Sequence, residues 1–178
     1  AMDLCNSGTL ESWMRNGSLD DVHVVPFLWD IISGMLYLHH VKHVVHRDIK
    51  PDNLFVQIST DEGRPRLIVG DVGLAKRVTR TMSLLSAAGA VAYRAPEAVA
   101  DVSFCTTASD VYAVSLVAVE LLTGDQVYEK CQGDTAAKAR LVRKAKPRIE
   151  AMLQFAEDSP LTMAAAWDVL QACTIDDP

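Results

Sequence analysis

Eight consecutive residues, H-R-D-I-K-P-D-N at positions 46–53, restrict the fold of this chain more than any other segment. They come after a predicted helix, residues 22–41, in which apolar residues recur at helical spacing. Two β-type runs come next, at 53–58 and 66–69, joined by the polar segment 59–65, which is the pattern of a hairpin with a long connection. The order predicts one charged loop held between a helix and a hairpin.

Three further helical regions are expected. Residues 9–15 favour a short helix that ends at the turn 16–18. Residues 110–123 are apolar on nearly every side, so this helix should be central and covered by protein, with Gly124 as its stop. From residue 135 onward the pattern predicts two or more helices, punctuated by Pro147 and Pro160. The fold class predicted is therefore α+β and mostly helical, with a small hairpin.

Composition narrows the class of protein. The formal charge of −6 gives no indication of a nucleic-acid surface, which is normally basic. Four cysteines lie far apart in the sequence, which favours reduced thiols over a zinc site. No signal peptide is visible, and the most apolar run, 112–122, is too short to cross a bilayer. These features predict a soluble chain with a cytoplasmic location and the nucleus as the alternative, and they leave open a membrane segment elsewhere in a parent protein.

The octet carries groups suited to phosphoryl transfer, and it fits the pattern H-R-D-x-x-x-x-N of the protein-kinase catalytic loop. On these residues the chain resembles the large C-terminal lobe of a eukaryotic-type protein kinase. The resemblance implies that Asp48 takes the proton of the attacking hydroxyl and that Lys50 steadies the transferring phosphoryl group. It implies that Asn53 holds Mg²⁺, which prefers oxygen ligands. Lys two places after the Asp is typical of the serine/threonine kind.

Two later motifs follow in the family's order. Asp71-Val72-Gly73 resembles D-F-G, whose Asp holds Mg²⁺ against the ATP phosphates. Residues 93–97, Y-R-A-P-E, resemble the end of an activation segment. Val72 replaces the usual Phe, and Ala90 stands where the family usually has a Thr that contacts the catalytic Asp and Lys. The first change predicts a looser regulatory switch, and the second puts efficient transfer in question.

Regulation and support of the loop are also implied by the resemblance. Arg47 would pair with a phosphate on the activation segment, and the hypothesis is that one of four residues there is phosphorylated: Thr79, Thr81, Ser83 or Ser86. The alternative is a polar loop without regulation. Asp110 matches a buried Asp that accepts hydrogen bonds from the catalytic-loop backbone, with an ordinary helix cap as the simpler interpretation.

The start of the chain resembles the hinge between kinase lobes. Met2 would guard the back pocket, Asp3 and Cys5 would offer backbone groups to adenine, and Phe55 would pack under its ring. The Gly-rich loop and the strand Lys of the family do not occur in these residues, and neither does the last helix of the lobe. Residues 1–178 are therefore interpreted as a partial kinase domain, whose face toward the missing N-lobe should be apolar.

Other residues favour structural roles. His39, His40, His43 and His46 resemble a metal cluster, but the loop register accounts for His46, and the others fit a helix end. The tryptophans, Trp13, Trp29 and Trp167, are expected to be core or interface anchors.

Three functions follow from these features. The first is a serine/threonine kinase that uses ATP and Mg²⁺ and has a protein substrate, with the isolated fragment inactive. The second is a pseudokinase that binds nucleotide or partners, suggested by Val72 and Ala90. The third is a truncated product that acts by protein interaction alone.

Overall fold

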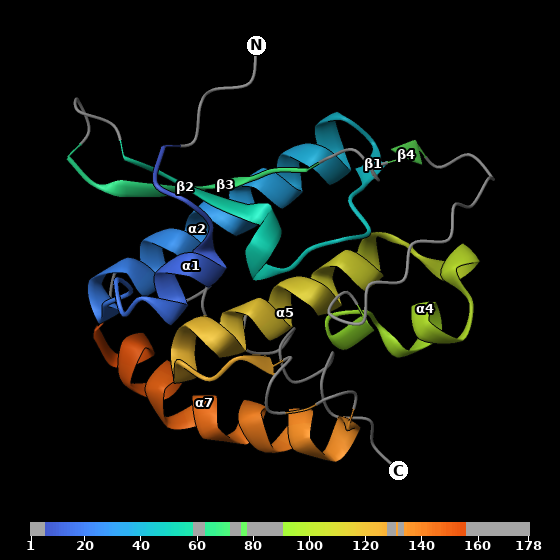
Figure 1. Ribbon diagram of the computed structural model, residues 1–178. Helices are drawn as coiled ribbons and strands as arrows, with labels where there is room; N and C mark the ends of the chain where they lie inside the picture. Colours follow the sequence, from blue (N-terminus) through green and yellow to red (C-terminus); the bar gives the residue numbers. More distant parts are fainter. Residues whose placement is uncertain are drawn as a thin grey trace.

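The computed structural model describes residues 6–58, 63–71, 76–77, 91–127, 131 and 134–155. Figure 1 shows a mostly helical body with a small hairpin along one side, which confirms the predicted α+β class. The described helices and strands are α1 (Leu10–Arg15), α2 (Asp21–Leu36), the π-helix η1 (Tyr37–Val41), β1 (Val44–Val45), the 3-10 helix η2 (Pro51–Asn53), β2 (Leu54–Ile58), β3 (Pro65–Val69), β4 (Lys76–Arg77), α4 (Pro96–Ala100), the 3-10 helix η4 (Val102–Phe104), α5 (Thr107–Thr123) and α7 (Thr135–Phe155).

Helix α5 lies at the centre, with α2 packed on one side and α7 on the other (Figure 1). Twelve of its seventeen residues are buried, as expected for a helix that is apolar on nearly every side. It begins three residues before the predicted start because Thr106 and Ser109 form a capping box. Gly124 ends it in the left-handed conformation, at φ 70°.

Helix α2 places the hairpin. Its inner face buries Val24, Phe27 and Ile31, and β3 lies against the same helix. The close approach requires a glycine, because a Cβ at Gly34 would lie 2.9 Å from Cγ2 of Val69. Asp30, which is buried, accepts a hydrogen bond of 2.9 Å from the backbone N–H of Leu67. The helix therefore holds the hairpin by both packing and a buried hydrogen bond.

The predicted helix over 22–41 is present, but its last turn differs from an α-helix. Residues Tyr37–Val41 form a π-helix, in which each backbone hydrogen bond spans five residues instead of four. Pro26 lies at the sixth position of α2, within its first two turns. Its missing N–H is tolerated because the carbonyl that loses its partner belongs to Val22, which is exposed to water.

Strands β2 and β3 form the predicted antiparallel hairpin, with each boundary within one residue of the expected position. The register runs from Leu54 opposite Val69 to Ile58 opposite Pro65. The backbone N–H of Gly70 donates to the carbonyl of Asn53 at 2.9 Å and extends the pairing by one step. The ends of the two strands that meet here are the ends that carry Asn53 and Asp71.

The expected break at Pro147 is wrong, because α7 continues through it. The ring blocks a hydrogen bond to the carbonyl of Arg143, four residues earlier. Both residues are exposed, so water replaces that bond. Pro160 lies outside the described residues.

One helical stretch, Asp21–Val41, has the length and apolar composition of a membrane-crossing helix. The core helix of a soluble protein passes the same test. Because this stretch buries one face in the core and carries the hydrogen-bonded Asp30 near its middle, it is an element of the fold described here.

Candidate active site

Asp110 fixes the backbone of the catalytic loop, residues 46–53. Its carboxylate accepts hydrogen bonds from the backbone N–H of His46 at 2.7 Å and of Arg47 at 2.8 Å. His39, on the π-helix, lies with Nε2 2.9 Å from the same carboxylate. The predicted support of the loop by Asp110 is confirmed, and the helix-cap alternative is wrong, since Thr106 caps α5.

His46 joins the loop to the hairpin. Its side chain is fully buried, and Nε2 lies 2.9 Å from the carbonyl of Gly70. A carbonyl only accepts, so Nε2 carries the proton and Nδ1 is left to accept the N–H of Asp48 at 3.4 Å. His46 therefore sets the position of the D-V-G segment relative to the catalytic loop. It is not a metal ligand in this arrangement.

Asp48 is held by two neighbours on the same loop. Nζ of Lys50 lies 3.0 Å from its Oδ2, and Nδ2 of Asn53 donates to the same oxygen at 2.8 Å. Asn53 also donates to the backbone carbonyl of Asp48 at 2.7 Å. Only about a tenth of the Asp48 side chain is exposed, at 13%. The structure thus brings together the predicted catalytic pair, Asp48 and Lys50, with one predicted metal ligand.

Asn53 and Asp71 present oxygen donors at the same end of the hairpin. Asn53 directly precedes β2 and Asp71 follows β3 by two residues, so the register places them diagonally across the pair. Because Nδ2 of Asn53 faces Asp48, its Oδ1 remains for another partner. Asp71 is exposed. One amide oxygen and one carboxylate suit Mg²⁺, so these residues fit the ion that the resemblance implies.

Backbone strain marks both parts of the site. In the described part of the chain, three residues other than glycine have positive φ, and two of them are Arg47 (φ 73°) and Asp71 (φ 54°). This region is unfavourable for side chains with a Cβ, and such residues concentrate at functional sites. The hydrogen bonds of Asp110 hold Arg47 in this conformation.

The Y-R-A-P-E segment is tied to the centre of the lobe by Tyr93. Its hydroxyl donates to Oε1 of Glu120 at 2.7 Å, and the N–H of Val127 donates to the same oxygen. Burial raises the pKa of Glu120 to about 8, against the effect of these two bonds. Burial and the nearby Glu120 carboxyl also raise the pKa of Tyr93. The segment is therefore fixed through a buried, hydrogen-bonded pair.

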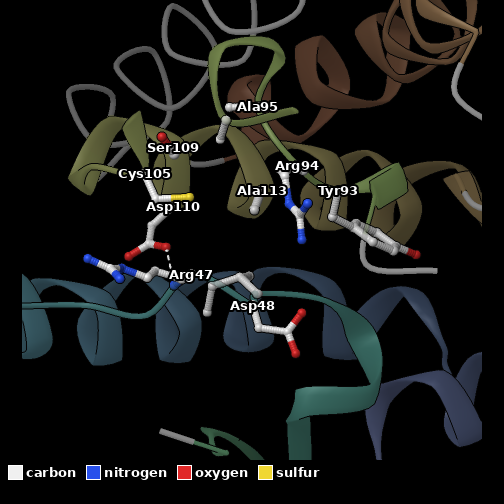
Figure 2. Close-up of a pocket in the computed structure, with 11 residues that line it drawn as sticks. Arg47, Asp48, Tyr93, Arg94, Ala95, Cys105, Ser109, Asp110 and Ala113 are labelled. Carbon is white, nitrogen blue, oxygen red and sulfur yellow. Dashed lines mark hydrogen bonds between the residues drawn. The ribbon is translucent and has the colours of Figure 1, made fainter. Parts of the chain in front are cut away.

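A small pocket lies between the catalytic loop and α4 (Figure 2). Arg47 reaches it from the loop and Arg94 from the segment before α4. The Nε of Arg47 is buried without a hydrogen-bond partner among the described residues. Burial raises the pKa of the Cys105 thiol on the pocket wall. The pocket is therefore lined by two guanidinium groups and by the carboxylates of Asp48 and Asp110.

Some predicted residues cannot be placed. The hinge residues, Met2, Asp3 and Cys5, lie outside the described residues, as do Val72, Ala90 and the four Ser/Thr candidates for phosphorylation. Phe55 is half-buried in β2 with its ring against Gly70, and its contact with adenine stays a prediction. For His39, His40, His43 and His46 the sequence favoured structural roles, and in the described part of the chain no group of three or more possible metal ligands occurs.

Sequence reasoning missed two contributors to the site. His39 was assigned to a helix end, yet it contacts Asp110 across 71 positions of sequence. Glu120 was assigned only to a central helix, yet it binds Tyr93. An ionisable residue in an otherwise apolar helix was the signal that could have indicated a buried partner.

Comparison with known proteins agrees with this geometry. The model of the protein kinase domain matches residues 1–178. Cytokinesis protein sepH of Emericella nidulans is 35% identical over 132 residues, which cover 74% of this chain and 9% of that protein. Cell division control protein 7 of Schizosaccharomyces pombe is 31% identical over 159 residues, which cover 89% of this chain and 14% of that protein. Mitogen-activated protein kinase 5 of Arabidopsis thaliana is 34% identical over 113 residues, which cover 64% of this chain and 28% of that protein.

The chain spans less than a third of the length of each of these relatives. The family match nevertheless extends over all its residues, and the described structure brings Asp48, Lys50 and Asn53 into contact with one another. The chain belongs to the protein kinase domain family.

Proposed function

We propose that the protein containing this chain is a serine/threonine protein kinase that transfers the γ-phosphoryl group of ATP to a protein hydroxyl. The observation that carries the proposal is the arrangement around Asp48, whose carboxylate is held by Lys50 and Asn53. A carboxylate fixed in this way can orient a hydroxyl and take its proton. The serine/threonine preference rests on Lys50 and on the resemblance. A relative from Dictyostelium discoideum, 34% identical over 146 residues, is named a probable serine/threonine-protein kinase.

Each residue has a separate role in the proposed transfer. Asp48 positions the attacking oxygen, and Lys50 places a positive charge beside it to steady charge on the phosphoryl oxygens. Asn53 and Asp71 would hold Mg²⁺, which when bound neutralises charge on the phosphates. Asp110, His39 and His46 position the loop and do not contact the reacting atoms in this account.

ATP would lie against this lobe with its adenine between Phe55 and the hinge residues Met2, Asp3 and Cys5. The opposite wall would come from the N-lobe, which the resemblance places before the hinge. The Asp48 side chain keeps 13% of its surface exposed, and a substrate hydroxyl would have to approach the carboxylate through that part.

The first test is phosphotransfer by the full-length protein from magnesium–ATP to a generic basic protein. Asp48→Asn keeps the shape of the side chain but removes the base. We expect the rate to fall by about 10²–10⁴-fold, the usual contribution of a positioned acid or base. The matched control is Asp134→Asn, the same chemical change at an exposed position before α7, which should retain the rate.

Equal activity of Asp48→Asn and wild type would contradict the proposed role. A wild-type protein that binds nucleotide without transferring phosphate would instead support the pseudokinase alternative. In that case, restoring Phe at Val72 and Thr at Ala90 would test the two departures from the family pattern.

A further inference from the structure

Helix α2 and the π-helix that continues it expose an unusual amount of apolar surface. Nine large apolar side chains are exposed in the described part of the chain, and six of them belong to this one stretch. They are Val22, Val25, Trp29, Leu36, Tyr37 and Val41. Trp29 is the largest of them and is 57% exposed. Single exposed apolar residues are common, but a contiguous set marks an interaction surface.

The exposed side chains have the spacing of a helix–helix seam. Val22, Val25, Trp29, the half-buried Ile32 and Leu36 follow one another at intervals of three, four, three and four residues. This is the alternation with which one helix packs along another. The opposite face of α2 is already buried, with Phe27 and Ile31 fully covered. A helix packed against protein on one face only would have a polar outer face. The apolar outer stripe of α2 therefore suits packing against a second helix.

Charge is distributed unequally along the same stretch. The N-terminal end carries two exposed carboxylates, Asp20 and Asp21, and Asp21 pairs with Arg148 of the same chain, which leaves Asp20 as the available charge. The C-terminal end carries three exposed basic residues, His40, Lys42 and His43. An identical helix lying antiparallel brings the acidic end of each copy to the basic end of the other, whereas a parallel arrangement places like charges together.

We propose that α2 and η1 form a homodimer interface, in which two copies of this stretch pack antiparallel about a twofold axis. Four of the five seam positions coincide when the axis passes between residues 30 and 31, the exception being Val22. Val25 then lies opposite Leu36 of the second copy, and Trp29 opposite its Ile32. The same register places Asp20 beside the end that carries His40 and Lys42. Apolar spacing and charge thus select one register, and the interface is isologous, as in most dimers.

The interface is expected to be weak. A helical stretch of 21 residues is about 31 Å long at 1.5 Å per residue. Two helices in contact over this length lie at the small end of specific interfaces, so association in the micromolar range is expected. A segment of the same polypeptide outside this chain is the competing occupant of the seam. The experiments below separate the two.

The first experiment measures sedimentation velocity of the full-length protein over a range of concentrations. We expect a concentration-dependent dimer in the wild type and at least a tenfold weaker dimer in Trp29→Glu, which places a charge at the centre of the seam. Phe104→Glu is the matched control, because Phe104 is equally exposed, at 58%, but lies on η4. That variant should dimerise like the wild type.

The second experiment tests the antiparallel register with two charge reversals. Asp20→Lys and Lys42→Asp should each weaken self-association, because each places like charges at both ends of the seam. When the two variants are mixed, every antiparallel contact is between opposite charges again. We therefore expect a heterodimer at least as stable as the wild-type dimer. In a parallel pair the wild-type ends already meet like charge to like charge. Neither single reversal would then weaken self-association, and the mixed pair would bind much more tightly than the wild type.

Particular results would overturn the proposal. A wild-type protein that stays monomeric at all concentrations, with Trp29 shielded from a soluble quencher, would assign the seam to another part of the same polypeptide. A dimer that is unaffected by Trp29→Glu would place the interface elsewhere. Failure of the mixed variants to associate, with each variant folded by circular dichroism, would exclude the antiparallel register.

Discussion

Glu120 shows how a single buried carboxyl can link the activation segment to the centre of the lobe. It has no exposed surface, and Oε1 receives both the Tyr93 hydroxyl and the Val127 N–H. Oε2 is buried without a hydrogen-bond partner among the described residues. An ionised carboxylate with one unsatisfied oxygen is costly in such a site, and this is why its pKa rises.

The raised pKa predicts a specific pH dependence of stability. The pKa of the Glu120 carboxyl is about 8 in the folded chain, against an ordinary value of 4.5, so the folded state binds the proton more tightly. The contribution of Glu120 to the free energy of unfolding is then greatest below pH 4.5. It decreases as pH rises toward 8 and levels off above that pH. Glu120→Gln cannot ionise and should lack this loss. Relative to that variant, the wild type should lose on the order of 2–4 kcal/mol between about pH 5 and 8.

Urea unfolding of wild type and Glu120→Gln at several pH values measures this difference. The titration of other groups is common to both proteins and cancels in the comparison. A difference that is constant between pH 5 and pH 8 would show that Glu120 is already ionised in the folded state.

Residues close in sequence were predictable, and pairs far apart were not. Asp48, Lys50 and Asn53 lie within six positions, so a motif alone indicates their common role. Asp71 follows after one hairpin, and the register places it beside Asn53. The contacts of Glu120 with Tyr93 and of His39 with Asp110 depend on how α5 packs under two loops, which no local pattern encodes.

At the scale of elements, the hairpin depends on a close contact between Phe55 and Gly70. An added Cβ at Gly70 would lie 2.5 Å from Cδ2 and Cε2 of the Phe55 ring. Gly70→Ala should therefore destabilise the protein by about 1–3 kcal/mol, the typical cost of overpacking. The double variant Gly70→Ala/Phe55→Leu should recover part of that loss because the smaller side chain relieves the collision.

Thermal or urea unfolding of the four proteins in this cycle gives the coupling energy directly. Phe55→Leu alone supplies the reference for the lost ring contacts. If Gly70→Ala costs the same in both backgrounds, the ring does not restrict position 70.

The helix and strand boundaries that were predicted correctly are those determined by neighbouring residues in the sequence. Strands and helices with clear apolar periodicity were predicted within a few residues, as for β2, β3 and α1. The start of α5 and the continuation of α7 through Pro147 were not. The first depends on a Thr–Ser capping box that precedes the apolar run, and the second on the exposure of one carbonyl, which only the packed structure determines.

For the whole molecule, the described residues contain the proposed transfer groups and, by the resemblance, would supply one side of a nucleotide site. The G-x-G-x-x-G loop and strand Lys of the family do not occur among the 178 residues. Purified residues 1–178 should therefore phosphorylate a protein at a rate lower than that of the full-length protein by roughly 10²-fold or more, because the phosphates are not positioned.

The comparison uses the same magnesium–ATP assay for both proteins, with Asp48→Asn of the full-length protein as the baseline. Circular dichroism of residues 1–178 must show a folded chain for the comparison to hold. A rate equal to that of the full-length protein would contradict the prediction and show that one lobe suffices.

The three hydrogen bonds of Asp110 also carry a consequence for how the chain folds. They join residues separated by 63, 64 and 71 positions, so none can form until α5 docks beside the loop. Contacts of such long range form slowly because a large loop must close first. We therefore expect Arg47 to reach its positive-φ conformation only after α5 has packed against the loop. The order of the proposed catalytic loop is then a property of the central helix as much as of the loop's own sequence.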